Sequence, residues 1–237
     1  MNKTVIFDLE QDKGLDQWLV EGNGALHITD TGALQISTHF LSGTQKATNV
    51  WRKDLELPDD FEVEIEFMSE SKNGNTMILF NALPVQLHDL FDDPRKDAAY
   101  ADLASKRKIQ LYTVGFHRSV YDRPSVLRKI GGMVPETWGD VPYPTPEWQE
   151  MDTVTTLHST QEPMPVSDKG KVHTFKLRKI DNHIWFWAND QLIHDYTDAL
   201  EYPYCDKVLK NGKLGFRNFV GPAEDVYSKI VVRKIEM

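Results

Sequence analysis

The sequence predicts an all-β protein, built as a two-sheet antiparallel β-sandwich of the jelly-roll type in a single domain over residues 1–237. Short runs in which apolar and polar residues alternate recur from one end of the chain to the other, as in strands with one buried face. Turn signals rich in Gly, Asn and Asp separate these runs. The length of 237 residues suits one sandwich domain, and a chain of this size buries roughly 70% of its unfolded surface.

The first predicted strands form a hairpin. Ala25–Ile28 and Ala33–Ser37 flank the turn sequence Asp30-Thr31-Gly32, which carries the residues typical of a tight connection. Phe61–Phe67 alternates most cleanly, with four apolar residues on one face and three glutamates on the other. This pattern predicts a strand that buries one face and exposes the other.

Further strands follow along the chain, and one turn signal stands at Asn189-Asp190. The predicted ranges are Thr76–Leu83, Lys108–Phe116, Val154–His158, His173–Ile180, Ile184–Trp187, Leu214–Val220 and Val226–Ile235. Only Pro94–Lys106 has a helical pattern, with its proline near the start. The segment Gly131–Asp152 carries four prolines among aromatic residues, and a loop of that length in a compact domain is usually functional.

The composition argues against several classes of protein. The net charge of −9 and the pI of about 5.4 disfavour nucleic acid and anionic membranes as partners. No run approaches 18 apolar residues, so no membrane-spanning helix is predicted. Acidic residues arrive before any long apolar run at the start, unlike a signal peptide, and the lone Cys205 excludes an internal disulfide. We therefore expect a cytoplasmic location.

Neither a metal nor a cofactor is predicted. The eight histidines show no H-x-x-x-H or H-E-x-x-H spacing, and no acidic loop of the EF-hand type appears. No glycine-rich phosphate loop follows a strand. A structural calcium ion, frequent in jelly rolls, has no sequence signature and is left open.

A basic segment stands out in this acidic chain. Between residues 106 and 129, seven cationic side chains face a single acid, Asp122, which gives +6 and leaves −15 for the rest of the chain. The cations are Lys106, Arg107, Lys108, Arg118, Arg123, Arg128 and Lys129. One interpretation is a site for an anion, because guanidinium groups match carboxylates and sulfates. The other is a solvated surface whose charges pair with the acidic remainder.

Three segments carry a resemblance to a known family. They are Tyr112-Thr113-Val114-Gly115-Phe116-His117-Arg118-Ser119, Leu127-Arg128-Lys129 and Gly212-Lys213-Leu214-Gly215-Phe216-Arg217. They resemble the YesU-like family of bacterial proteins of unknown function, found in loci for polysaccharide use, within the concanavalin A-like lectin/glucanase superfamily. The resemblance covers nearly the whole chain. It implies a jelly roll whose concave face handles sugar, and it implies no established reaction.

An anionic-sugar pocket is predicted near the end of the strand Lys108–Phe116. If Ile109 and Leu111 face the core, alternation places Tyr112 and Arg118 on the opposite face. Tyr112 then forms a wall of the pocket, and Arg118 and Arg128 bind the anion.

Proton transfer in this pocket is assigned to His117 and Tyr121. His117 titrates near neutral pH and can act as acid or base, and Tyr121 is its candidate partner. His158, next to the long loop, is a second candidate acid or base. For each of them the alternative is a purely structural role.

Other residues are candidates for direct sugar contacts. The ring of Trp51 can stack on a pyranose, although simple core packing is the favoured interpretation because buried aromatic residues dominate protein cores. Asn81 can hydrogen-bond a hydroxyl group, and Arg217 can bind substrate or pair with an acid. Trp185 and Trp187 share a face and are interpreted as structural.

The strand Phe61–Phe67 holds a rival site. Its three same-face acids, Glu62, Glu64 and Glu66, resemble the alternating acids of jelly-roll glucanases. Same-face carboxyls lie roughly 6–7 Å apart along a strand, near the separation of about 5–5.5 Å in retaining glycosidases. A solvated outer strand explains the pattern equally simply and is favoured, so we expect the three acids to be solvent-facing.

These observations predict a carbohydrate-active protein. The preferred hypothesis is an enzyme that cleaves an acidic, uronate-containing oligosaccharide by elimination or hydrolysis. In elimination, Arg118 or Arg128 neutralises the uronate carboxylate, while His117 or Tyr121 takes the proton and returns one to the leaving oxygen. The alternatives are a non-catalytic, lectin-like binding module and a glucanase-like hydrolase. No oligomeric state is predicted.

Overall fold

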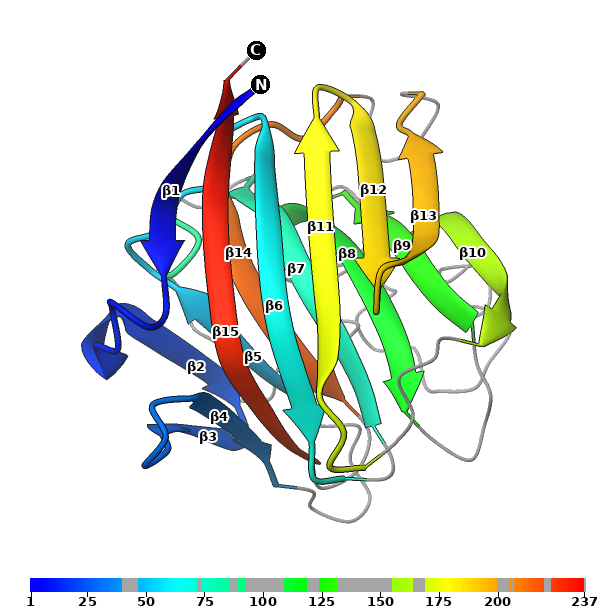
Figure 1. The fold of residues 1–237 in the computed structure, drawn as a ribbon. Coiled ribbons are helices and arrows are strands. Elements are labelled where there is room, and N and C mark those ends of the chain that lie inside the picture. Colours follow the sequence, from blue (N-terminus) through cyan, green and yellow to red (C-terminus); the bar gives the residue numbers. More distant parts are fainter. Residues whose placement is uncertain are drawn as a thin grey trace.

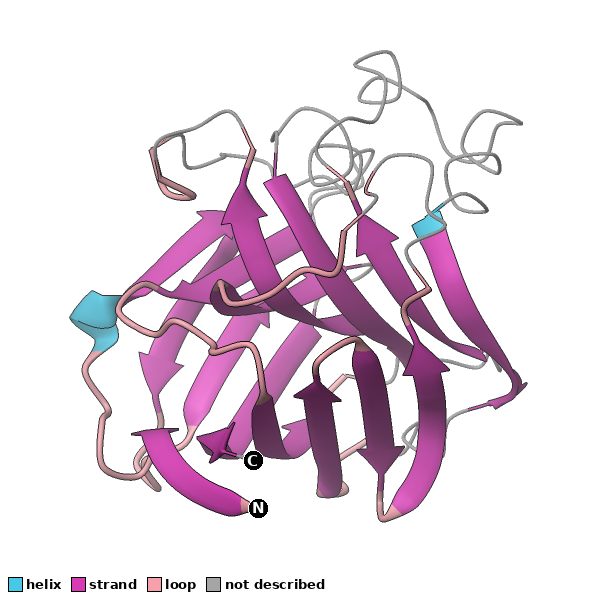
Figure 2. Cartoon of the chain, turned by 90° about the horizontal axis from the view of Figure 1, so that it is seen from above, coloured by secondary structure: helices cyan, strands magenta, loops and turns pink. Residues whose placement is uncertain are grey.

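The computed structural model of the chain contains two antiparallel β-sheets packed face to face (Figure 1). It describes residues 1–39, 47–71, 74–85, 89–92, 109–118, 124–131, 155–163, 169–199, 205, 207–219 and 223–236. Seen from above, the strands form two layers with turns between them (Figure 2). The predicted two-sheet antiparallel sandwich is confirmed.

Sheet A has eight strands within the described ranges, in the order β13-β12-β11-β6-β15-β4-β3, with β1 also paired to β15. Its strands are β1 (Asn2–Asp8), β3 (Gly24–Ile28), β4 (Leu34–Thr38), β6 (Phe61–Ser69), β11 (His173–Ile180), β12 (His183–Ala188), β13 (Gln191–Thr197) and β15 (Ala223–Glu236).

Sheet B has seven strands in the same described ranges, in the order β10-β9-β8-β7-β14-β5-β2. Its strands are β2 (Trp18–Gly22), β5 (Ala47–Arg52), β7 (Gly74–Pro84), β8 (Ile109–Arg118), β9 (Pro124–Ile130), β10 (Thr156–Pro163) and β14 (Lys213–Phe219). A short 3₁₀ helix, η1 (Leu15–Gln17), precedes β2.

The predicted strands appear in the structure, and the hairpin of β3 and β4 is among them. The alternation does not predict β1, β2, β9 and β13, and the structure adds them. The expected helix Pro94–Lys106 lies outside the described residues, as does the expected loop Gly131–Asp152 apart from its first residue.

The main core fills the space between the two sheets. The apolar face of β6, which comprises Phe61, Val63, Ile65 and Phe67, lies in this core as alternation predicts. Sheet B contributes alternate residues such as Phe80 and Phe216 to the same cluster. The two sheets therefore bury facing rows of side chains, as in other β-sandwiches.

The outer face of sheet B, turned away from sheet A, is also buried. Trp51, Met77, Leu79 and Leu111 form a second apolar cluster there, together with Leu90. Every residue of β5 is buried, whereas an antiparallel strand with one solvated face alternates. The outer face of sheet B is thus a second interior, which is where a ligand site can be enclosed.

The predicted orientation of β8 is wrong. Ile109 and Leu111 belong to the outer cluster of sheet B, while Tyr112 lies in the main core between the sheets. Both faces of β8 are apolar enough to be buried, so alternation separates the two faces without saying which one is the core.

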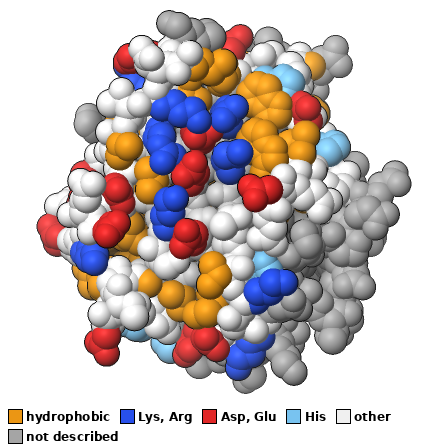
Figure 3. All heavy atoms as spheres, in the orientation of Figure 1, with side chains coloured by type: hydrophobic (Ala, Val, Ile, Leu, Met, Phe, Trp, Pro, Cys, Tyr) orange, Lys and Arg blue, Asp and Glu red, His pale blue; other side chains and the backbone are white. Residues whose placement is uncertain are grey.

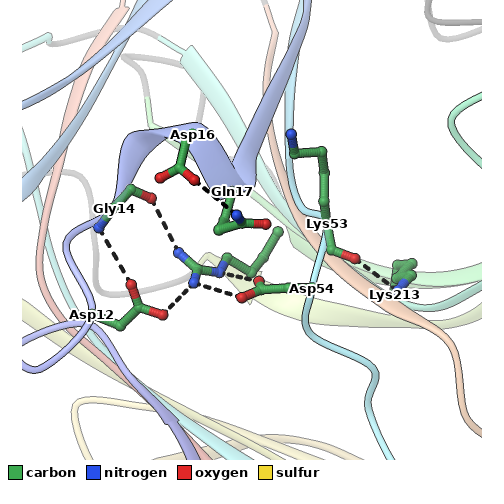
Figure 4. A network of polar contacts seen from close by, with 8 residues as sticks. Asp12, Gly14, Asp16, Gln17, Lys53, Asp54 and Lys213 are labelled. Carbon is green, nitrogen blue, oxygen red and sulfur yellow. Dashed lines mark hydrogen bonds and ion pairs between the residues drawn. The ribbon is translucent and has the colours of Figure 1, made fainter.

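Arg52, at the end of β5, anchors the N-terminal segment to sheet B by its contacts with Asp12, Gly14 and Asp54, which are labelled in Figure 4. Its guanidinium is bound by the carboxylates of Asp12 and Asp54, with Nε 2.5 Å from Asp54 Oδ1, and Nη1 donates to Gly14 O at 3.3 Å. The same group lies 4.9 Å from the ring centroid of Phe7. These contacts hold β5, which carries part of the candidate site, in a fixed position.

The two ends of the described chain lie side by side (Figure 1). Asn2 of β1 pairs with Glu236 of β15. None of the described helical segments is long and apolar enough to cross a membrane.

Candidate functional site

A continuous row of residues crosses the outer face of sheet B. Strand register places Glu21 opposite Asn49, and Asn49 opposite Arg217. The row continues from Arg217 to Met77 and then to Gly115. Five neighbouring strands thus each contribute one side chain or glycine to one line.

Hydrogen bonds connect the polar end of this row. Arg217 Nη1 donates to Asn49 Oδ1 at 2.8 Å, and Asn49 Nδ2 donates to Glu21 Oε2 at 3.3 Å. Trp51 Nε1 donates to the same carboxylate oxygen at 2.8 Å. All four side chains are no more than 1% exposed. A buried acid and a buried guanidinium are therefore held in fixed positions by a shared amide, which prepares the site before any ligand arrives.

The ring of Trp51 lies against Gly215 of β14. A Cβ atom on Gly215 would be only 2.5 Å from Trp51 Cε3, so the ring can lie there only because residue 215 has no side chain. Trp51 is fully buried and packs with the outer cluster. In the structure Trp51 therefore packs within the floor of the outer face of sheet B, while its stacking on a sugar stays a prediction.

Two buried oxygen atoms in this region lack hydrogen bonds. Asn75 Oδ1 and Thr113 Oγ1 have no partner among the described residues, although the two residues are only 6% and 0% exposed. A buried polar atom without a partner costs about 1–3 kcal/mol. A Cβ atom on the neighbouring Gly115 would lie 3.7 Å from Asn75 Oδ1, so the glycine leaves space beside that oxygen.

The basic residues predicted for the pocket lie near these oxygens in the strand register. Arg128 of β9, which is partly buried, pairs with Thr113 of β8. His117 pairs with Asn75, and Arg118 pairs with Gly74. The structure describes only the backbone of His117 and Arg118, and Tyr121 lies outside the described residues. The predicted convergence of these four side chains therefore stays a prediction.

Comparison with known proteins assigns a family. A profile described as Domain of unknown function (DUF1961) matches residues 5–152, which is more than half of the chain. The chain belongs to the DUF1961 family. The DUF1961 match begins within β1 and ends between β9 and β10, so it includes Glu21, Asn49, Asn75 and Thr113, whereas Arg217 lies beyond it. No curated protein matched the chain.

Solved structures share the fold of this DUF1961 chain at low identity. A Bacillus subtilis protein of unknown function with a galectin-like fold is 21% identical, with a TM-score of 0.73 over 96% of this chain and 94% of that one. A Bacillus licheniformis β-glucanase is 10% identical, with a TM-score of 0.57 over 98% of each chain. Carbohydrate-binding module CBM66 from Bacillus subtilis is 14% identical, with a TM-score of 0.51 over 89% of this chain and 91% of that one. The expected lectin/glucanase-like fold is thereby confirmed.

The predicted role of Tyr112 as a pocket wall in the DUF1961 chain is wrong, because Tyr112 faces the core between the two sheets. Its hydroxyl donates to Asp198 and accepts a hydrogen bond from Leu209 N at 3.1 Å. Lys129 Nζ lies 2.7 Å from Asp198 Oδ2, and both residues are buried. Burial and the neighbouring carboxylate raise the pKa of Tyr112. This network is fully paired and links sheet B to the end of β13.

His158 lies at the edge between the two sheets and not on the outer face of sheet B. Its Nδ1 is 2.7 Å from Nδ1 of His194, whose Nε2 is 2.8 Å from Ser125 Oγ. Ser125 Oγ donates to Gly115 O, so His194 Nε2 donates to Ser125 and its Nδ1 accepts from His158. Burial, with His158 beside it, lowers the pKa of His194 to about 3. The pair therefore links β10 to β13.

Asn81 lies at an irregular point of β7. Its φ of 49° is unusual for a residue other than glycine, and asparagine tolerates it best. Its Nδ2 donates to Asn211 O at 3.0 Å. Asn81 therefore supports the segment before β14, and the structure does not bring it into the row with Arg217.

The acids of the rival site face outward from sheet A. Glu62 is only 1% exposed, because Lys3 lies 2.6 Å away and Arg178 2.5 Å away. Burial alone would raise the pKa of Glu62, but the hydrogen bonds from these two cations lower it. The expectation that all three acids face solvent is therefore wrong for Glu62, while Glu64 is 32% exposed.

The residues of this face that the sequence did not reveal as candidates are Glu21, Asn49, Asn75 and Thr113. Alternation in the sequence Trp-Leu-Val-Glu-Gly of β2 would have put Glu21 on the same face as Leu19. No group of three or more metal-ligating side chains occurs among the residues that the structure describes.

Proposed function

We propose that the chain binds carbohydrate on the outer face of sheet B, and that the carbohydrate is acidic. The observation that carries the proposal is the pair of buried oxygens, Asn75 Oδ1 and Thr113 Oγ1, without partners among the described residues. They lie in the same region as the hydrogen-bonded row that ends in Arg217. Sugar hydroxyls can donate to both oxygens and remove the cost of leaving them unpaired.

The chemistry of the surrounding face fits a sugar. The row offers donors and acceptors set in a floor of aromatic and aliphatic side chains, which is the usual composition of a small-molecule site. Arg128 lies beside Thr113 in the register, and a guanidinium binds a carboxylate through two parallel hydrogen bonds. The structural neighbours named as a β-glucanase and as a carbohydrate-binding module support a sugar ligand.

Cleavage of the bound oligosaccharide by elimination is a second candidate function. The observation that favours it is the position of His117, whose backbone pairs with Asn75. In this reaction Arg118 or Arg128 neutralises the uronate carboxylate, and His117 or Tyr121 takes the neighbouring proton and returns one to the leaving oxygen. Hydrolysis of a glycosidic bond usually needs two carboxyl groups. The described part of the row contributes one, Glu21, so the row favours elimination over hydrolysis.

Three further expectations belong to this proposal. The finer resemblance to the YesU-like family, the cytoplasmic location and the absence of nucleic acid and membrane partners remain predictions.

Calorimetry with Thr113→Val tests the binding site. Valine keeps the shape of the side chain and removes a hydroxyl that has no partner in the described protein. We expect the free energy of unfolding to stay equal or to rise, while affinity for an oligogalacturonate falls about 5- to 10-fold, as expected for one lost hydrogen bond. Ser37→Ala, which removes a hydroxyl from sheet A, is the control and should leave affinity unchanged.

The acidic preference is tested with Arg128→Ala. Loss of one charge-assisted hydrogen bond weakens binding by about 1.5–3 kcal/mol, or roughly 10- to 150-fold, for the oligogalacturonate but not for its carboxyl-reduced analogue. Equal losses for both ligands would remove the acidic preference, and no binding of either ligand would remove the proposed function.

Absorbance of an unsaturated product, lost in His117→Ala, would establish elimination.

A further inference from the structure

The outer face of sheet A carries ordered stripes of side chains. Acids on β6 lie between cations on β15 and cations on β11, and tryptophans on β12 follow. Figure 3 shows basic and acidic groups interleaved over this sheet, with hydrophobic side chains beside them. The two sheets pack through their inner faces, so this outer face of sheet A and the row on the outer face of sheet B lie on opposite sides of the sandwich.

The two tryptophans of β12 differ in what covers them. Trp185 stacks on His183, with ring centroids 3.9 Å apart. The His183 ring is held by both nitrogens, at 2.5 Å from Asp195 Oδ1 and 3.0 Å from Thr197 Oγ1. A fixed imidazole therefore occupies one face of Trp185.

Two cationic side chains lie over Trp187, and one of them can move. The guanidinium of Arg178, which Glu62 holds, is 5.5 Å from the ring centroid. Lys176 Nζ lies 4.4 Å from the ring centroid, and no carboxylate of the described chain pairs with it. Lys176 is directly opposite Glu64 in the register, but Glu64 is bound by Arg233 at 3.1 Å and Lys229 at 3.3 Å. A lysine held only by an aromatic ring can turn its ammonium group toward a ligand.

A groove opens beside this ring. Its volume is about 210 Å³, below the roughly 300–1,000 Å³ of pockets for drug-sized molecules. The polar side chains that line it with Trp187 are Glu64, Glu66, Thr174, Lys176, Asp190 and Lys229. Two ammonium groups thus face three carboxyl groups, so the lining disfavours an anion and offers both donors and acceptors.

We propose that this groove is a second saccharide site, which binds one neutral pyranose ring. The apolar face of the sugar stacks on Trp187, its hydroxyls donate to Glu66 and Asp190, and Lys176 donates to a hydroxyl oxygen. A neutral polyol suits a lining of mixed sign, because each of its hydroxyl groups both donates and accepts. The inference is independent of the acidic-sugar site on sheet B.

Nuclear magnetic resonance of the full chain labelled with nitrogen-15 tests this site. The probes are methyl β-glucopyranoside, methyl β-galactopyranoside and methyl α-mannopyranoside. The chain has six tryptophans, and the indole signal lost in Trp187→Phe identifies Trp187. We expect at least one probe to shift that signal saturably while the Trp51 signal stays in place.

Variants decide whether the ring and the lysine bind the sugar. Trp187→Ala should weaken binding about tenfold, and Lys176→Met should weaken it severalfold. Trp185→Phe is the matched control and should leave the affinity unchanged, because Trp185 does not line the groove and His183 occupies one face of its ring. The proposal is overturned if no probe gives a saturable shift of Trp187, or if Trp187→Ala and Lys176→Met, folded as judged by thermal unfolding, bind like the wild type.

Discussion

His194 is a neutral histidine enclosed at the edge of the sandwich. It is fully buried, its Nε2 contacts Ser125 Oγ, and its Nδ1 contacts His158. A proton added to its ring would place a charge in a dry site beside a second imidazole, which explains why its pKa falls to about 3.

This lowered pKa predicts a loss of stability in acid. The unfolded chain takes up a proton on His194 below its ordinary pKa of 6.5, while the folded chain does so only near 3. The histidine therefore contributes stability that is fully present above pH 6.5 and is lost as the pH falls toward 3, by up to about 1.4 kcal/mol per pH unit.

Urea unfolding between about pH 7 and pH 4 measures this contribution. His194→Gln should flatten the decline, because glutamine does not titrate, whereas replacement of the exposed His27 by Gln should leave the decline as it is. Identical slopes for His194→Gln and the wild type would contradict the assignment.

At the residue scale, alternation finds which side chains share a face but not what that face meets. The sequence correctly separates Tyr112 from Ile109 and Leu111, yet both faces of β8 are buried. Two of the site residues, Asn75 and Thr113, are recognisable only after packing has shown that their oxygens lack partners. No local pattern in the sequence reports a missing hydrogen bond.

At the scale of the elements, a buried ion pair joins β9 to the end of β13. Lys129 and Asp198 are both buried, with Nζ and Oδ2 2.7 Å apart, and Tyr112 donates to the same carboxylate. The contact fastens an outer strand of sheet A across the core to sheet B.

Asp198→Asn should remove the charge that Lys129 requires. An ammonium group left buried without its partner costs about 3–5 kcal/mol, so we expect the free energy of unfolding to fall by that amount. Asp195→Asn, on the exposed face of β13, is the matched control and should change it by less than about 0.5 kcal/mol. Denaturant unfolding of the two variants measures the difference, and a similar small effect in both would show that the pair is not needed.

Two of the strands that the sequence does not predict, β1 and β13, have weak patterns. β1 exposes its first five residues, including Val5 and Ile6, and β13 is mostly exposed or partly buried. Edge strands of this kind bury little, so hydrophobic alternation is faint there. By contrast, β6 and β11 each have two neighbours in sheet A and alternate clearly, and both were predictable.

At the scale of the whole molecule, β15 holds sheet A together. It pairs with β1, β4 and β6 and contributes Tyr227, Ile230 and Val232 to the main core. β1, in contrast, pairs only with β15 among the described strands. The two terminal strands therefore differ greatly in how much structure depends on them.

Truncation separates the two cases. A chain that ends at residue 222 should show no cooperative thermal unfolding, because β4 and β6 lose their common neighbour. A chain without residues 1–8 should still unfold cooperatively at a lower temperature, since Glu62 keeps Arg178 at 2.5 Å after Lys3 is gone. Calorimetry of both chains checks this. Cooperative unfolding of the chain that ends at residue 222 would disprove the central role of β15.

The place of β15 also governs the order of events during synthesis. Residues 223–236 leave the ribosome after β4 and β6. Strand β6 therefore lacks its pairing partner β15 while the earlier strands are already outside the exit tunnel. A nascent chain stalled before β15 presents the apolar row of β6 on a strand that can pair with β11 at one edge and is open at the other. Holding chaperones bind such open apolar strands, and the chain aggregates when they are absent.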